Sequence, residues 1–217
     1  RFRTEAGFIG RTLADPALKT PLAIFFLSTF AFANMETTLV LLASRWYDFK
    51  EADISWLFTF IGFVMVMVQG GFVGRAAKRS GEKSLILSGS LLVALGFGLT
   101  VVLHQVWGLY LAMAVIAVGI SINNPSNQSI ISKLASPAEV GGVLGVGQSL
   151  STLGRILGPL AGGAAFQYLG VESPYYLGAG VMVLVFLLAL KLPGRPRNNT
   201  PEERSIEPVN QAGVGTA

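Results

Sequence analysis

The sequence predicts an all-α membrane protein with six transmembrane helices. The chain of 217 residues is 52% hydrophobic and only 13% charged, which is far more apolar than a soluble domain of this length. Its apolar residues form continuous runs rather than the period-two alternation of a membrane β-strand. The runs have about the length needed to cross a bilayer core as helices, and they are residues 21–43, 54–74, 84–103, 107–131, 142–166 and 175–190.

The segments that flank the runs predict a connector and a tail. Residues 1–20 have the pattern of an amphipathic cytoplasmic connector, in which Asp15-Pro16 is typical of a turn or a helix start. Residues 193–217 are rich in Pro, Asn, Glu and Arg and hold too little apolar area to fold, so we expect a disordered cytoplasmic tail. Because the chain opens on Arg1 rather than on methionine, we expect it to be part of a longer protein.

Charged and aromatic residues predict the orientation of the runs in the membrane. Of the 16 lysines and arginines, all but Arg45, Lys50 and Arg155 lie before the first run, after the sixth, or in the second and fourth loops. The positive-inside rule then places both ends of the chain in the cytoplasm. The tryptophans and tyrosines lie near the opposite ends of the runs, where interfacial aromatic residues anchor helices.

Glu36 is the only acid in the first run, and it lies near the middle. A carboxyl group at that depth is costly, and such groups persist where they serve a transport pathway, a proton relay or an ion pair. We therefore predict that Glu36 couples protons or senses a substrate.

The fifth run carries two different faces. One face is polar and about 60° wide, and it consists of Gln148, Thr152 and Arg155. The other has the small residues of close helix packing, and it consists of Gly154, Gly158, Gly162 and the adjacent Gly163. Pro159 lies within the glycine repeat and predicts a bend, because it removes a backbone hydrogen bond.

Glu36 and Arg155 are predicted to lie at similar depths, about 22 and about 20 Å from the cytoplasmic ends of their runs at about 1.5 Å per residue. The two charges could pair across a cavity, which would lower the cost of keeping either one in the membrane. Two alternatives remain open. Glu36 could take a proton or a cationic substrate while Arg155 responds, or the two could form a permanent structural ion pair.

The fourth run has a polar segment around Pro125, which consists of Ser121, Asn123, Asn124, Asn127 and Gln128. One alternative is a kinked segment that lines a wet cavity, where freed backbone groups are satisfied. The other is a set of interhelical hydrogen bonds that only hold the bundle together, each worth about 0.6 kcal/mol. Asn34 in the first run is a further candidate for the cavity lining.

Composition excludes several other functions. The chain has no cysteine, which rules out disulfides, thiolate metal sites and a cysteine nucleophile. The net charge of +4 comes from residues at the ends of apolar runs, so we expect no nucleic-acid partner. No catalytic set lies inside the runs, and we expect no enzyme activity, metal or cofactor. His104, at an outer helix end, is expected to be an interfacial residue.

Three segments resemble the major facilitator superfamily, over about residues 15–192. The short basic turn from Gly71 to Lys83, with Gly74-Arg75 where the family has an Asp and with Gly81, is similar to the family's glycine- and basic-rich loop. Residues 154–163 are similar to the antiporter signature of glycine, three residues, Gly-Pro, two residues and Gly-Gly. Residues 124–126 with 136–141 resemble the tenth helix and the loop that follows it.

This resemblance implies that the chain is the C-terminal half of a 12-helix fold, in the drug:proton antiporter or tetracycline-efflux-like branch. Each half is an inverted three-plus-three repeat, with the substrate site near the midplane between the halves. The implied partners are a small-molecule substrate, protons, the lipid bilayer and the missing N-terminal six-helix half. The implied location is a bacterial-type inner membrane.

The residues and the resemblance together predict a secondary transporter that exports a small amphipathic molecule, driven by protons. Uptake by the same fold and a non-transporting sensor or scaffold are the alternatives. Sodium coupling also stays open, because one carboxyl group does not decide between the two ions.

Overall fold

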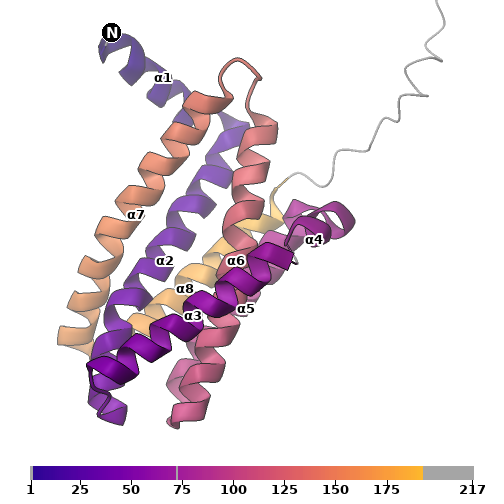
Figure 1. The fold of residues 1–217 in the computed structure, drawn as a ribbon. Helices are drawn as coiled ribbons and strands as arrows, with labels where there is room; N and C mark the ends of the chain where they lie inside the picture. Colours follow the sequence, from indigo (N-terminus) through magenta and orange to yellow (C-terminus); the bar gives the residue numbers. More distant parts are fainter. Residues whose placement is uncertain (1, 72, 193–217) are drawn as a thin grey trace, which may run out of the picture.

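The computed structural model describes residues 2–71 and 73–192; most of these residues are helical, and no strand is found among them. The predicted tail, residues 193–217, lies outside the described residues. The helices, labelled in Figure 1, are α1 (Phe2–Ala14), α2 (Pro16–Tyr47), α3 (Glu51–Gly71), α4 (Val73–Ser80), α5 (Glu82–Val102), α6 (Val106–Leu134), α7 (Val140–Leu169) and α8 (Ser173–Leu190).

Each of the six apolar runs corresponds to one long helix to within a turn or two, although residues 73 and 74 of the second run belong to α4. Five of these helices, α2, α3, α5, α6 and α8, are long and apolar enough to cross a membrane by length and composition. Helix α7 is long enough but is not among the five, and its sequence is rich in glycine and serine. The all-helical membrane fold is confirmed.

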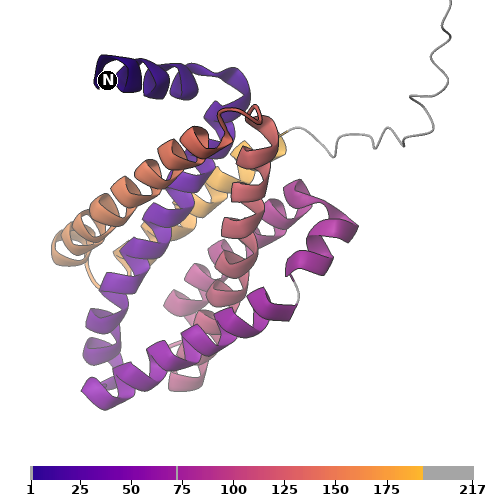
Figure 2. The same ribbon diagram turned by 45° about the horizontal axis from the view of Figure 1, so that its top comes forward.

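The break between α1 and α2 lies at Asp15. Its carboxylate accepts a hydrogen bond from Ala17 N at 2.8 Å, and Pro16 occupies the first turn, where a missing N–H is harmless. Helix α1 (indigo in Figure 2) then leaves the bundle at the end where α2 begins. The Phe8 ring of α1 lies close to Gly142 near the start of α7, because a Cβ atom on Gly142 would be 2.8 Å from the ring. Helix α1 therefore packs on the start of α7.

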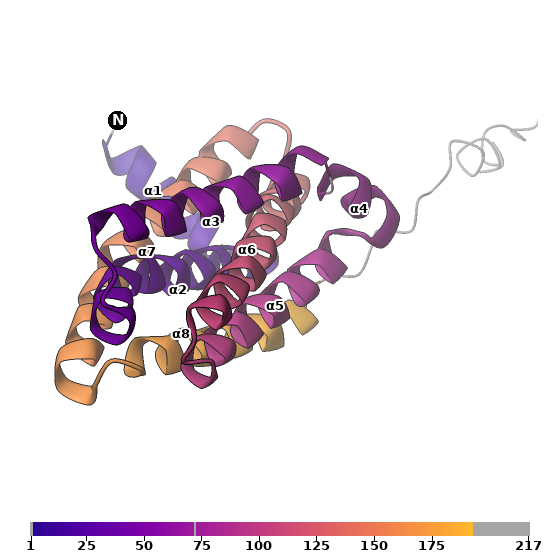
Figure 3. The same cartoon turned by 60° about the horizontal axis from the view of Figure 1, so that its bottom comes forward.

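The bundle has α3 and α8 on opposite sides, with α2 and α6 between them (Figure 3). Helices α5 and α6 touch through backbone, because a Cβ atom at Gly89 would lie 2.8 Å from Gly119 O. The core between α2, α5, α6 and α8 is filled by fully buried side chains, which include Leu39, Phe97, Met113 and Tyr175.

Helix α3 is the least buried of the long helices. It packs mainly against α6, and only Leu57 and Ile61 of its side chains are buried. Large apolar side chains lie on the remaining surface of α3, and those of Trp56 and Val66 are 69% and 70% exposed. This helix therefore presents a broad apolar surface outside the bundle.

Candidate functional site

The packing of α7 on α2 is set by three glycines four residues apart, Gly154, Gly158 and Gly162. A Cβ atom at Gly154 would lie 2.9 Å from Phe26 O, and one at Gly158 would lie 2.6 Å from Phe30 O. A Cβ atom at Gly162 would overlap Asn34 Oδ1. Each step of four residues along α7 matches a step of four along α2, so the two helices run in the same direction with their backbones in contact. This match fixes which residues of the two helices lie side by side.

Glu36 is exposed on a face of α2 that points away from α7 and α8. Two residues earlier, Asn34 is fully buried against Gly162 and donates a hydrogen bond from Nδ2 to Pro174 O of α8 at 2.7 Å. Two residues turn a helix by about 200°, which directs Glu36 to the opposite side. Within residues 2–71 and 73–192, the Glu36 carboxylate has no hydrogen bond or ion pair.

The polar face of α7 is also exposed. Arg155 and Gln148 are exposed, as is Thr152, whose hydroxyl group donates to Gln148 O of its own helix at 3.0 Å. The described part of the chain holds ion pairs between His104 and Glu172 and between Lys133 and Glu82, but none that includes Arg155. Arg155 therefore presents its charge on the surface of the bundle without an acid beside it.

The predicted similar depth of Glu36 and Arg155 does not match the packing of α7 on α2. Gly154 lies between Phe26 and Phe30, which puts Arg155 beside about residue 29 of α2. Glu36 is then about seven residues, or about 10 Å, farther along α2 at about 1.5 Å per residue. The two depths were counted from the first apolar residue of each run. The glycine contacts, however, place the first residue of the α7 run beside about residue 16 of α2, about five residues before the α2 run begins.

Hydroxyl groups on α2 contact α6 and α7 about one turn before Arg155. Ser28 Oγ donates to Asn123 Oδ1 of α6 at 3.2 Å, and Thr29 Oγ1 lies 3.2 Å from Ser151 Oγ of α7. These contacts join three helices through buried polar groups one turn before Arg155. Ser28, Thr29 and Ser151 were not among the predicted site residues, although adjacent hydroxyl residues in an apolar run are a usable signal.

Three of the predicted cavity residues are interhelical contacts instead. Asn34, Asn123 and Asn127 are fully buried, so they line no exposed surface of the structure. Asn123 Nδ2 donates to Ile86 O at 3.3 Å, and Asn127 Nδ2 donates to Pro21 O at 2.9 Å. For these residues the structure favours the alternative in which amides hold the bundle together.

Hydrogen bonding is less complete for several other oxygen atoms in the polar segment of α6. In the part of the chain that the structure describes, Ser121 Oγ, Asn124 Oδ1 and Asn127 Oδ1 are buried without a hydrogen-bond donor. All three flank Pro125, which has no N–H to offer the Ser121 carbonyl. Buried oxygens of this kind normally bind water. Asn124 and the exposed Gln128 thus agree better with the wet alternative.

The predicted basic turn from Gly71 to Lys83 is mostly helix. Residues 73–80 form α4, since Ala76, Ala77, Lys78 and Arg79 favour helix, and Gly81 ends it with φ +79°, a left-handed value that suits glycine. Arg75 is exposed. Cβ atoms at Gly71, Gly74 and Gly163 would meet nothing within 4 Å, so these glycines serve no close packing.

Charged residues at the end of this segment hold one end of the bundle together. Lys83 Nζ donates to Leu190 O at 2.8 Å and to Leu192 O at 2.7 Å, which caps the last carbonyls of α8. The neighbouring Glu82 forms an ion pair with Lys133 and accepts from Ser129 Oγ at 3.1 Å. Together these contacts tie the start of α5 to the ends of α6 and α8.

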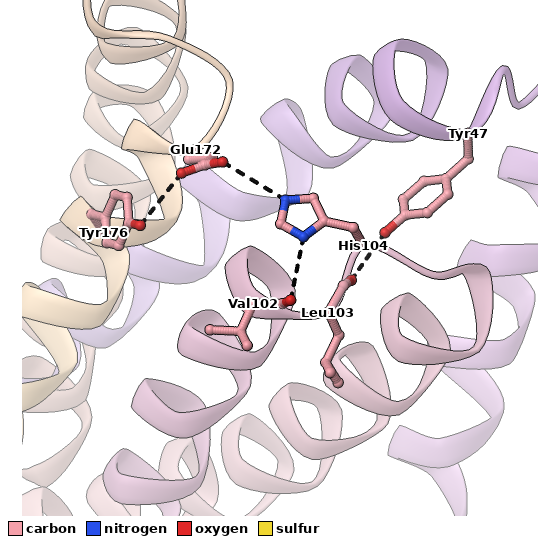
Figure 4. Close-up of polar contacts among 6 residues, drawn as sticks. All are labelled: Tyr47, Val102, Leu103, His104, Glu172 and Tyr176. Carbon is pink, nitrogen blue, oxygen red and sulfur yellow. Dashed lines mark hydrogen bonds and ion pairs between the residues drawn. The ribbon is translucent and has the colours of Figure 1, made fainter.

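The opposite end is held by the contacts in Figure 4. His104 Nε2, between α5 and α6, lies 3.9 Å from Glu172 Oε1, and Glu172 Oε2 accepts from Tyr176 OH at 3.3 Å. Tyr47 OH, at the end of α2, donates to Leu103 O at 3.2 Å. The His104 side chain is 60% exposed, which fits a residue at the rim of the bundle rather than a buried relay.

A bundle of long apolar helices, five of them able to cross a membrane, defines a polytopic integral membrane protein. The chain belongs to the major facilitator superfamily, whose family model matches residues 22–214.

Relatives of known name agree with this family. The chain is 28% identical over 180 residues to the major facilitator superfamily domain-containing protein 10 of Mus musculus, covering 83% of this chain and 39% of that protein. It is 32% identical over 148 residues to the multidrug resistance protein MdtH of Photorhabdus laumondii, covering 65% of this chain and 37% of that one.

Solved structures show the same fold. The crystal structure of the human organic anion transporter MFSD10 (TETRAN) matches with a TM-score of 0.75 and 25% identity over 81% of this chain and 42% of that chain. A peptide transporter, POT, matches with a TM-score of 0.72 at 22% identity. The chain spans well under half the length of the relatives that it matches.

Proposed function

We propose that this chain is the C-terminal six-helix half of a secondary transporter that exports a small amphipathic molecule, driven by protons. The observation that carries the proposal is the exposed Glu36 carboxylate, partway along a helix able to span a membrane and without a partner in the described residues. A carboxyl group so placed can bind and release a proton as the bundle moves between access states.

The missing N-terminal half would cover the exposed sides of α2 and α7 that carry Glu36 and Arg155. These sides and the apolar surface of α3 are unpaired in the described chain. The names of the relatives, an organic anion transporter and a multidrug resistance protein, support a small organic substrate. The proposal places the protein in a bacterial-type inner membrane with both termini in the cytoplasm, in agreement with the distribution of lysine and arginine.

Two flux measurements on the protein as its gene encodes it test this function. In vesicles with an imposed proton gradient, the wild type moves a fluorescent organic probe against its concentration gradient. Glu36→Gln loses this gradient-driven flux but keeps exchange of the probe at equal pH, because exchange needs no net proton transfer.

The control is Glu51→Gln, which removes an exposed acid from the first turn of α3 and leaves driven flux unchanged. Driven flux that survives in Glu36→Gln would contradict proton coupling through this residue. Accumulation of the probe on the opposite side would show uptake, and no flux of any probe would leave the sensor or scaffold alternative.

A further inference from the structure

His104 and Glu172 come together at the end of the bundle shown in Figure 4, and the proposed function uses neither of them. We propose that the two side chains bind a divalent metal ion of the Zn²⁺ type, which bridges the loop between α5 and α6 to the start of α8. This metal site does not depend on the transport function, because its contacts lie at one end of the bundle and do not include Glu36.

The two side chains offer atoms that zinc prefers, at nearly the right spacing. An imidazole nitrogen and a carboxylate oxygen are common ligands of Zn²⁺ and bind it at about 2.0–2.2 Å. Two such atoms on a tetrahedral ion lie about 3.4 Å apart. His104 Nε2 and Glu172 Oε1 are 3.9 Å apart, so a shift of about 0.5 Å by either exposed side chain is enough.

The hydrogen bond of the other ring nitrogen favours metal binding by Nε2. His104 Nδ1 lies 3.3 Å from Val102 O. A carbonyl oxygen can only accept, so in the neutral imidazole Nδ1 carries the proton and the lone pair of Nε2 is directed to Glu172. Histidines that bind metal ions almost always have such a contact on the second nitrogen.

The Glu172 carboxylate is oriented in the same way. Its Oε2 atom accepts a hydrogen bond from Tyr176 OH of α8 at 3.3 Å, which leaves Oε1 for the metal ion. Hydrogen bonds to a carboxylate ligand hold it in the orientation that the metal ion needs. Both proposed ligands therefore have an outer hydrogen bond that positions them.

Contacts with the end of α2 hold the imidazole in place. The ring centroids of Trp46 and His104 are 4.6 Å apart, and the ring planes are tilted by 38°. Tyr47 OH donates to Leu103 O at 3.2 Å, which fixes the residue directly before His104. The histidine is thus held on two sides although it lies in a loop, and such support gives a metal ligand its position before the ion binds.

Exposure and ligand number define the kind of metal site. The side chains of His104 and Glu172 are 60% and 42% exposed, so a metal ion can enter from water. Among the described residues, no third histidine, cysteine or acid completes a group of three. Water would fill the remaining positions, and the ion would exchange rather than serve as a structural ion. The nitrogen ligand favours Zn²⁺ over Mg²⁺ and Ca²⁺, which prefer oxygen.

An ion pair is the alternative use of the same two side chains. It needs a proton on His104 Nε2, whereas a metal ion takes the place of that proton. Glu172→His distinguishes the two uses. It replaces the carboxylate by an imidazole of similar reach, which binds Zn²⁺ but forms no ion pair with a histidine.

Titration of the purified protein with ZnCl₂, as its gene encodes it and without a histidine tag, tests the proposal by isothermal titration calorimetry. We expect the wild type to bind Zn²⁺ saturably. His104→Gln and Glu172→Gln each weaken this binding at least about tenfold, because each removes a ligand. Glu172→His retains the binding. Tyr176→Phe removes only the outer hydrogen bond and weakens the binding by a smaller factor.

Two controls separate this site from unspecific attraction of cations. Glu51→Gln removes an exposed acid from the first turn of α3 and leaves Zn²⁺ binding unchanged. MgCl₂ in place of ZnCl₂ gives no saturable binding that depends on His104, because Mg²⁺ keeps its waters and selects oxygen ligands. Circular dichroism of each variant checks its helix content.

Three results would overturn the proposal: no saturable Zn²⁺ binding by the wild type, unchanged binding in His104→Gln, or loss of binding in Glu172→His. The last of these would assign the two side chains to an ion pair. Mg²⁺ binding with the affinity of Zn²⁺ would also overturn it, since charge alone would then explain the attraction. None of these measurements uses flux, so a failure of the transport proposal leaves their result unchanged.

Discussion

Asn34 donates a hydrogen bond from Nδ2 to the carbonyl oxygen of Pro174 at 2.7 Å, and this bond ties α2 to the first turn of α8. Asn34 is fully buried, and its Oδ1 atom lies against Gly162 of α7. One amide thus joins three helices directly behind Glu36. Its position makes Asn34 a structural support for the face that carries the carboxylate.

We predict that Asn34→Ala lowers the free energy of unfolding by about 1 kcal/mol, because interhelical hydrogen bonds in membrane bundles contribute on that scale. Unfolding in mixed detergent micelles, followed by circular dichroism, measures the change. Thr37→Ala is the matched control, since Thr37 Oγ1 donates only to Ala33 O of its own helix. Equal stability of Asn34→Ala and the wild type would contradict this role.

The glycine contacts between α2 and α7 lead to a second prediction. A Cβ atom at Gly158 would lie 2.6 Å from Phe30 O, which is backbone and cannot rotate away. Gly158→Ala therefore destabilises the bundle by about 1–3 kcal/mol, measured in the same unfolding assay. Gly163→Ala lies on the same helix but meets nothing within 4 Å, and it leaves stability unchanged. A similar result for both variants would show that α7 does not pack on α2 in this register.

The ion pair between Glu82 and Lys133 is expected to contribute little. The Lys133 side chain is 57% exposed, so water screens the charge. A double-mutant cycle with Glu82→Gln and Lys133→Met gives a coupling free energy of about 0.2–1 kcal/mol that falls as salt rises. A larger coupling that does not depend on salt would mean that this end of the bundle is shielded from water.

The sequence was sufficient to predict the six long helices but not their mutual register. Continuous apolar runs locate α2, α3, α5, α6, α7 and α8, because a run must be hydrogen-bonded internally to cross a membrane. Helix α4 was not predicted, since glycines at both ends of residues 71–83 resemble a turn more than a two-turn helix.

The candidate site was predicted in part. Glu36 and Arg155 stand out because charges are rare in apolar runs, and both are exposed in the structure. The distance between them along the bundle follows from the contact of Gly158 with Phe30. This contact between two helices cannot be found by counting residues along a single run. The partners of Asn34, Asn123 and Asn127 are backbone carbonyls, which no sequence pattern marks.

The central claim is that the bundle carries two exposed charges, Glu36 on α2 and Arg155 on α7, that act independently, and a double-mutant cycle with Glu36→Gln and Arg155→Gln tests it most directly. The unfolding free energies of the two single variants and the double variant are measured for the protein as its gene encodes it. We predict that the two effects add to within about 0.5 kcal/mol, as they do for residues that are not in contact. A coupling well above about 1 kcal/mol would show that the two side chains form an ion pair and would contradict their independence.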